Sequence, residues 1–168
     1  PLRLSPLFES VLEVVRSGCI GSINQVQAVN NVPYGGVYYS QPYRDYEITG
    51  GLWLQKATHD FDYINQVLGQ PIRITAMMSQ KIYGGDMPND LWCSSCDKSE
   101  ETCMESPQGI IRRNDHGGVG ESDHPCVFGN RIKNQDCGSA LILYEDGTHA
   151  SYTQNMVSRR SAARRGAI

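Results

Sequence analysis

The sequence predicts an α+β fold, in which helices pack on one face of a largely antiparallel, open β-sheet. Three observations lead to this class. Apolar side chains recur at steps of three and four over residues 52–68, residues 71–82 alternate apolar and polar side chains, and two strand-like runs flank Asp146-Gly147. The first pattern is typical of an amphipathic helix, the second of a strand and the third of a β-hairpin.

The chain opens with a predicted helix and a predicted strand. The helix spans residues 5–18, where Ser5 suits the N-cap position and apolar side chains again recur at helical spacing. Residues 21–32 then read as a strand, with Val26 and Ala28 on one side and glutamines on the other.

The helix over residues 52–68 is the element around which the chain is organised. Its apolar stripe, which must be buried, consists of Leu54, Ala57, Phe61, Ile64 and Leu68. The polar row on the opposite side consists of Gln55, His59, Asp62 and Gln66, flanked by Lys56 and Tyr63. Gly69 and Pro71 end the helix.

The polar row contains groups that suit a site at which protons move. His59 titrates near neutral pH and can take or give a proton. Lys56 disfavours the protonated imidazole and can hold a substrate oxygen, while Asp62, one turn later, can fix the imidazole tautomer. The alternative is a solvated outer face that carries one surface histidine.

The remaining strands frame a long insertion. Residues 71–82 are predicted as a half-buried strand, and residues 139–145 and 148–157 as the two arms of the hairpin. Between them, residues 83–137 form a long, Cys-containing insertion loop without clear periodicity. We therefore expect a single α+β domain over residues 1–168 that carries this insertion.

The loop at residues 33–49 is rich in tyrosine and contains Arg44. Tyr38 and its neighbours offer flat apolar area with a hydroxyl group, and the Arg44 guanidinium offers a fork of donors. Such a mixture suits a polyhydroxylated substrate such as a sugar. The alternative is a set of tyrosines that pack over the edge of the sheet.

Four cysteines in the insertion have a spacing that can close a tetrahedral zinc site, namely Cys93, Cys96, Cys103 and Cys126. His116 and His124 are alternative ligands. Such a zinc ion would be structural, because nothing in the sequence places it beside His59. The alternatives are free thiols in a reducing cytoplasm and disulfides formed on isolation.

The composition is that of an ordinary soluble domain, for which we expect a cytoplasmic location. The formal charge of −3 argues against nucleic acid as a general partner, and no apolar run approaches the length of a membrane span. The chain begins at Pro1 without Met, and we expect both of its ends to be cut from a longer protein.

The run from Gly50-Gly51 to Asp62 resembles a conserved block of the Gfo/Idh/MocA oxidoreductases, the family of glucose–fructose oxidoreductase and inositol dehydrogenase. The run from Ser17 to Ile23 is also similar to the link into the first sheet strand of that family's C-terminal domain. By position, the resemblance implies that His59 is the catalytic acid/base and that Lys56 contacts the substrate. Gln55 stands where many members carry an acidic residue.

The resemblance also implies what lies around these residues. Substrate binding would involve Arg44, Gln55, Tyr38 and Asp62. NAD or NADP would be bound mainly by a dinucleotide-binding half expected before Pro1, so the fragment has no cofactor-binding residues and is expected to be inactive alone. The substrate would be a sugar, a cyclitol or a related secondary alcohol, and the outer sheet face would mediate a homo-oligomer. The alternatives are a non-catalytic sugar-sensing or assembly relative and a zinc-stapled interaction module.

Overall fold

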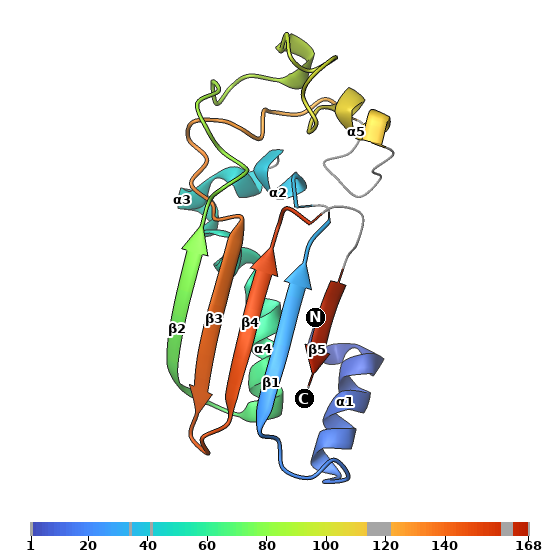
Figure 1. The fold of residues 1–168 in the computed structure, drawn as a ribbon, viewed down its shortest axis with the longest axis vertical. Helices are drawn as coiled ribbons and strands as arrows, with labels where there is room; N and C mark the ends of the chain where they lie inside the picture. Colours follow the sequence, from blue (N-terminus) through green and yellow to red (C-terminus); the bar gives the residue numbers. More distant parts are fainter. Residues whose placement is uncertain (1, 34, 41, 114–121, 159–162, 168) are drawn as a thin grey trace.

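The computed structural model describes residues 2–33, 35–40, 42–113, 122–158 and 163–167, and its centre is one mixed sheet (Figure 1). The strands are β1 (Gln25–Asn31), β2 (Pro71–Ser79), β3 (Cys137–Tyr144), β4 (His149–Asn155) and β5 (Ala163–Ala167), in the order β2-β3-β4-β1-β5. Three neighbouring pairs are antiparallel, whereas β1 and β4 run parallel. The α+β class is confirmed, and the parallel pair makes the sheet mixed.

The helical elements are short, apart from two of 11 residues. They are η1 (Leu2–Leu4), α1 (Pro6–Arg16), α2 (Val37–Ser40), η2 (Pro42–Arg44), α3 (Tyr46–Thr49), the π-helical η3 (Trp53–Ala57), α4 (Thr58–Leu68), η4 (Cys93–Ser95) and α5 (Pro107–Arg113). No helix in the described ranges is long and apolar enough to cross a membrane.

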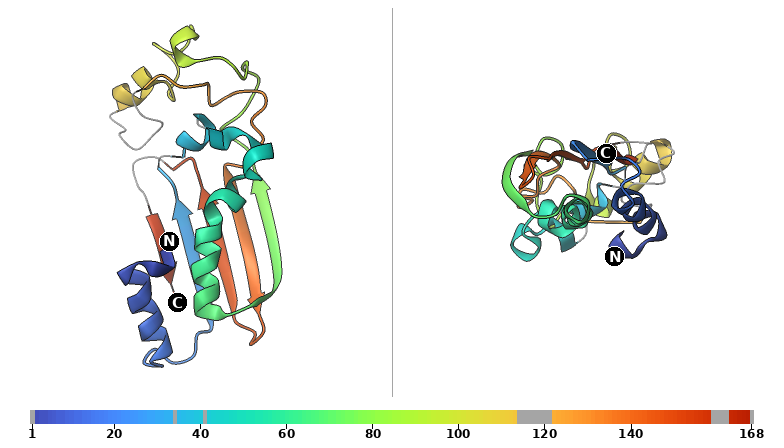
Figure 2. Two further views of the ribbon diagram at one scale, coloured as in Figure 1. Left: turned by 180° about the vertical axis from the view of Figure 1, so that it is seen from behind. Right: turned by 90° about the horizontal axis from the view of Figure 1, so that it is seen from below.

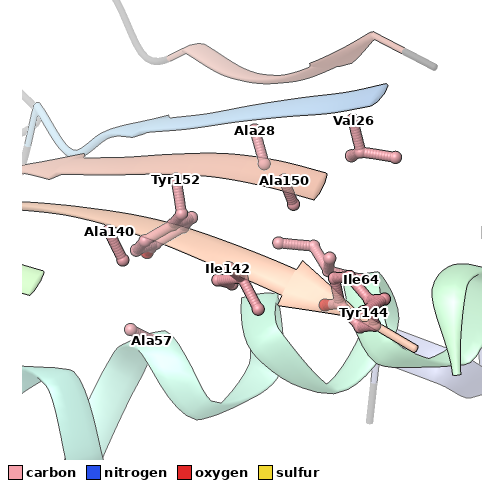
Figure 3. Packing of buried hydrophobic residues seen from close by; sticks show 9 residues of the cluster. All are labelled: Val26, Ala28, Ala57, Ile64, Ala140, Ile142, Tyr144, Ala150 and Tyr152. Atoms are coloured by element: carbon pink, nitrogen blue, oxygen red, sulfur yellow. The ribbon is translucent and has the colours of Figure 1, made fainter. Parts of the chain in front are cut away.

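Helix α4 lies along one face of the sheet and forms the main core with it (Figure 2). The alternation of apolar and polar residues along each strand sends every second side chain to this face. The buried members are Val26, Ala28, Ala57, Ile64, Ala140, Ile142, Tyr144, Ala150 and Tyr152 (Figure 3). The predicted hairpin is confirmed, and Asp146 stabilises its turn by accepting a hydrogen bond from the backbone N–H of Thr148 at 2.9 Å.

Strand β2 differs from the prediction of a half-buried strand. Its side chains are exposed on both faces up to Met78, including Ile74 at 55% and Met77 at 76% of the full side-chain area. The reason is that β2 is an edge strand beyond the part of the sheet that α4 covers, since no β2 residue belongs to the core that α4 forms with the sheet. An alternating pattern therefore predicted the strand correctly but not its burial.

The segment between β2 and β3 extends past the end of the sheet where α2 and α3 lie (Figure 1). Its base is held by Asp136, a buried carboxylate that accepts hydrogen bonds from the backbone N–H groups of Lys81, Ile82 and Tyr83. A second apolar cluster joins the segment to the end of the sheet and consists of Val32, Tyr39, Leu52, Tyr83, Val127, Ile132 and Met156. The segment thus has packing of its own, which its lack of periodicity did not indicate.

Candidate functional site

The helix predicted over residues 52–68 consists of two parts, and the difference decides which side chains are buried. Residues Trp53–Ala57 form a π-helical turn, and α4 continues from Thr58. A π-helical turn contains more residues than an α-helical turn. The side chains that precede α4 therefore point in different directions around the helix axis than they would in an uninterrupted α-helix. Leu54, predicted to be buried, is 63% exposed as a result, whereas Lys56 is only 8% exposed.

Lys56 and Tyr38 are brought together from separate elements. The Lys56 ammonium donates a hydrogen bond to the Tyr38 hydroxyl at 3.0 Å and lies 5.0 Å from the centre of the Tyr38 ring. The Tyr38 ring in turn contacts the ring of Tyr43, with 5.6 Å between centroids. A buried ammonium and a phenol at hydrogen-bond distance form a donor pair that can hold an alcohol oxygen.

His59 lies three residues after Lys56, in the first turn of α4, and is exposed. An exposed imidazole can exchange protons with a bound molecule and with water, as a general acid or base requires. Asp62, by contrast, is engaged elsewhere, because its carboxylate accepts two hydrogen bonds from the guanidinium of Arg3. That interaction with Arg3 holds the pKa of Asp62 below its usual range.

Gln55 occupies the start of the same surface. Its side-chain oxygen is buried and has no hydrogen-bond partner among the described residues. A buried acceptor without a partner costs free energy, on the order of 1–3 kcal/mol.

The structure adds Asp60, which the sequence analysis did not select. Its carboxylate is completely buried and accepts hydrogen bonds from the Asn30 amide at 2.6 Å and from the Tyr152 hydroxyl at 2.7 Å. Burial, followed by the nearby Asp60 charge, raises the pKa of Tyr152. Asp60 thus fixes α4 to strands β1 and β4, one helical turn from Lys56.

A signal for Asp60 was present in the sequence. It lies three residues after Ala57 and four before Ile64, on the face that those two buried residues define. A carboxylate on that face had to be buried and therefore had to find donors.

Arg44 lies apart from Lys56, beside a cavity of about 350 Å³ whose wall also includes Trp92 and Asp123. One terminal nitrogen of its guanidinium donates to the Asn89 side-chain oxygen at 2.8 Å and to the Asn89 carbonyl at 3.3 Å. Gly129 makes room for this nitrogen, because a Cβ there would lie 2.4 Å from it. Partial burial lowers the pKa of Arg44, which means that the surroundings penalise its charge.

The predicted zinc site is not supported. Within the described ranges, no group of three or more His, Cys, Asp or Glu side chains is arranged to hold a metal ion, and His116 lies outside those ranges. Cys93 and Cys126 are buried, Cys96 and Cys103 are partly buried, and all four are free thiols. The ring nitrogens of His124 each lie 3.0 Å from a backbone carbonyl oxygen, of Pro125 and of Glu105, and the ring N–H can donate to one of them.

Comparison with known proteins identifies the family. The sequence profile of the GFO/IDH/MocA C-terminal domain matches residues 8–168. The chain belongs to this family. As a GFO/IDH/MocA C-terminal domain it is similar to YteT of Bacillus subtilis, a protein that carries the name of an oxidoreductase. The two are 27% identical over 176 residues, which covers 90% of this chain and 41% of YteT.

Solved structures share the fold. The scyllo-inositol dehydrogenase of Lactobacillus casei matches with a TM-score of 0.58 and 17% identity, over 98% of this chain and 36% of that chain. The myo-inositol 2-dehydrogenase of Lactobacillus plantarum matches with a TM-score of 0.59 and 16% identity, over 98% and 36%. At these identities the likeness shows the fold alone, and the GFO/IDH/MocA domain spans less than half of each relative.

Proposed function

We propose that this chain is the substrate-binding domain of an NAD(P)-dependent oxidoreductase that acts on a sugar, a cyclitol or a related secondary alcohol. The observation that carries the proposal is the pairing of the buried Lys56 ammonium with the Tyr38 hydroxyl at 3.0 Å, three residues before the exposed His59 imidazole. Two relatives of the same fold are named as inositol dehydrogenases, and one of them was solved with NAD(H) and scyllo-inositol bound. We treat residues 1–168 as one substrate-binding unit that carries the 83–137 insertion.

In the proposed reaction, His59 accepts the proton of the substrate hydroxyl group. The carbon atom that carries this hydroxyl group loses a hydride to the nicotinamide. Lys56 and Tyr38 donate hydrogen bonds to the same oxygen and stabilise the negative charge that develops on it. In this proposal Gln55, one residue before Lys56, also contributes to substrate binding. A nicotinamide cofactor, bound mainly by parts of the parent protein outside this chain, would supply the hydride acceptor.

The donor set present here fits that role. Alcohol oxidation by hydride transfer requires one group that takes a proton and at least one donor for the oxygen, and His59, Lys56 and Tyr38 provide both. Asp60 helps to position His59, its neighbour on α4, because it ties this helix to the sheet.

A non-catalytic, sugar-sensing relative is the second candidate, and Gln55 favours it. The resemblance places an acidic residue at this position in many members, and an amide cannot assist His59 as a carboxylate can. Both candidates bind a sugar, so only turnover separates them.

The test is to screen the full-length parent against a panel of sugars and cyclitols with NAD and with NADP. Absorbance at the wavelength of the reduced nicotinamide reports turnover, and thermal shift reports binding. Reduced cofactor with at least one panel member supports the oxidoreductase. Thermal stabilisation by a sugar without any reduced cofactor supports the sensor and contradicts the oxidoreductase.

We also propose that the parent is a homo-oligomer that associates through the outer face of the sheet. Met77 and Leu141 are 76% and 62% exposed on neighbouring strands of that face, opposite the α4 side. The two residues are diagonal neighbours across the strand pair, and exposed apolar side chains that lie close together are typical of a protein interface. Light scattering of a Leu141→Lys variant should give a smaller species than the unchanged parent, and an unchanged mass would contradict the proposal.

A further inference from the structure

The cavity beside Arg44 is built differently from the surface around Lys56 and His59. It lies between the Ser40–Arg44 stretch and the part of the long segment that contains Trp92 and Asp123. Its volume of about 350 Å³ falls at the low end of the range for small-molecule sites, roughly 300–1,000 Å³. This volume suits a single sugar-sized unit rather than a dinucleotide.

One wall of the cavity carries the Arg44 guanidinium, which has no acidic side chain within ion-pair distance among the described residues. No ion pair joins Arg44 to an acidic side chain in the described part of the chain, where the ion pair observed is Arg3–Asp62. The Asn89 oxygens occupy one terminal nitrogen of the guanidinium, and its Nε has no hydrogen-bond partner among the described residues. A bound anion would offset the burial penalty on this charge, and a carboxylate oxygen can accept from the terminal nitrogen of the guanidinium that Asn89 does not engage.

The other walls select among anions. Trp92 is 46% exposed at the cavity and offers a flat apolar face, against which the C–H groups of a sugar ring can pack. Asp123 is exposed, with one carboxylate oxygen accepting from the Ser94 backbone N–H at 2.9 Å. The Asp123 carboxylate repels any anion, a ligand carboxylate included, but it also accepts hydrogen bonds from hydroxyl groups, which a sugar acid carries and sulfate lacks. His124 also lines the cavity, with its ring nitrogens each 3.0 Å from a backbone carbonyl oxygen, of Pro125 and of Glu105.

The cavity is connected to the proposed catalytic residues by contacts along one loop. Lys56 contacts Tyr38, the Tyr38 ring contacts the Tyr43 ring, and Arg44 follows Tyr43 directly. Tyr38 and Tyr43 thus lie between Lys56 and Arg44 along this series of contacts.

We propose that this cavity is a binding subsite for a sugar that carries a carboxylate, that is, a hexuronate unit. Arg44 binds the carboxylate, Trp92 packs against the ring and Asp123 accepts from its hydroxyls. The inference rests on the proposed function only in expecting a sugar-like ligand, and its test measures binding rather than turnover.

The test is isothermal titration of the 168-residue chain with sodium glucuronate and sodium galacturonate, with glucose and sodium sulfate as comparison ligands. We expect saturable binding of at least one hexuronate, at least tenfold weaker binding of glucose, and no saturable binding of sulfate. Arg44→Gln should weaken hexuronate binding at least tenfold. Arg131→Gln, which removes the same charge from an exposed position in the segment between β2 and β3, should leave it unchanged.

Two further variants keep the result interpretable. Arg44→Lys retains the charge without the fork and should bind with intermediate affinity, and Trp92→Ala removes only a partly exposed ring and should weaken binding. The inference is overturned if neither hexuronate binds at about 20 mM, which would detect even millimolar affinity. Equal hexuronate affinity in the Arg44→Gln and Arg131→Gln chains would overturn the inference as well. Saturable sulfate binding that depends on Arg44 would also overturn it, because it would indicate an adventitious ion only. Hexuronate binding by a parent that shows no turnover would leave this inference standing while refuting the oxidoreductase.

Discussion

Replacement of Asp60 by alanine should destabilise the fold severely, because it removes the acceptor for two buried donors. The Asn30 amide and the Tyr152 hydroxyl are 4% and 1% exposed by residue, and both donate to the same Asp60 oxygen. Each buried donor left without a partner costs about 1–3 kcal/mol, so Asp60→Ala should lose about 2–6 kcal/mol. This is a large share of the roughly 5–15 kcal/mol that stabilises a typical domain.

The assay is urea unfolding of the 168-residue chain, followed by far-ultraviolet circular dichroism. Tyr152→Phe removes one donor and leaves the carboxylate with Asn30, so it should lose less, about 1.5–3 kcal/mol. Asp86→Ala, which removes a carboxylate from an exposed position, should stay within about 0.5 kcal/mol of the unchanged chain. A loss in Asp60→Ala as small as that in Asp86→Ala would refute the anchoring role of Asp60.

Two further predictions concern stability. Burial, with the neighbouring thiols, raises the pKa of Cys93 from about 9 to about 12, so the thiol stays protonated in the folded state after it would ionise in the unfolded chain. The raised pKa of Cys93 therefore contributes stability that is complete below about pH 9 and is lost as the pH rises toward 12. The free energy of unfolding should begin to fall near pH 9. It should fall less steeply in a Cys93→Ala chain. A slope unaffected by that substitution would contradict the assignment. Gly138→Ala should cost about 1–3 kcal/mol in urea unfolding, because its Cβ would lie 2.5 Å from the Trp53 ring, whereas Ser139→Ala, at an exposed position, should be neutral. Equal stability of these two variants would show that the strand moves to accept the methyl group.

The strands and the hairpin could be predicted because local patterns determine them. Val26 and Ala28 alternate with exposed glutamines as expected, and the Asp146-Gly147 turn lies between β3 and β4. Burial of β2 could not be predicted, because alternation indicates that a strand has an apolar face but not whether another element covers it.

The candidate site was predicted in part. The sequence pointed to Lys56, His59 and Tyr38, and the structure places the first and the last of these in contact. The π-helical turn could not be foreseen, since a regular helical repeat assigns Leu54 to the buried side. The hydrogen bonds of Arg44 could not be predicted, because their acceptor Asn89 is 45 residues away in the sequence. A contact over such a separation leaves no local sequence pattern.

The most direct test of the proposed chemistry is steady-state kinetics on the full-length parent, with the substrate found in the panel screen. His59→Asn should lower kcat by roughly 10²–10⁴-fold, the usual contribution of a general acid or base, while the Kd for the cofactor stays within about twofold. His149→Asn, which removes an exposed imidazole at the start of β4, should leave both values unchanged. A His59→Asn parent that turns over as fast as the His149→Asn parent would contradict the assignment of His59 as the group that takes the substrate proton.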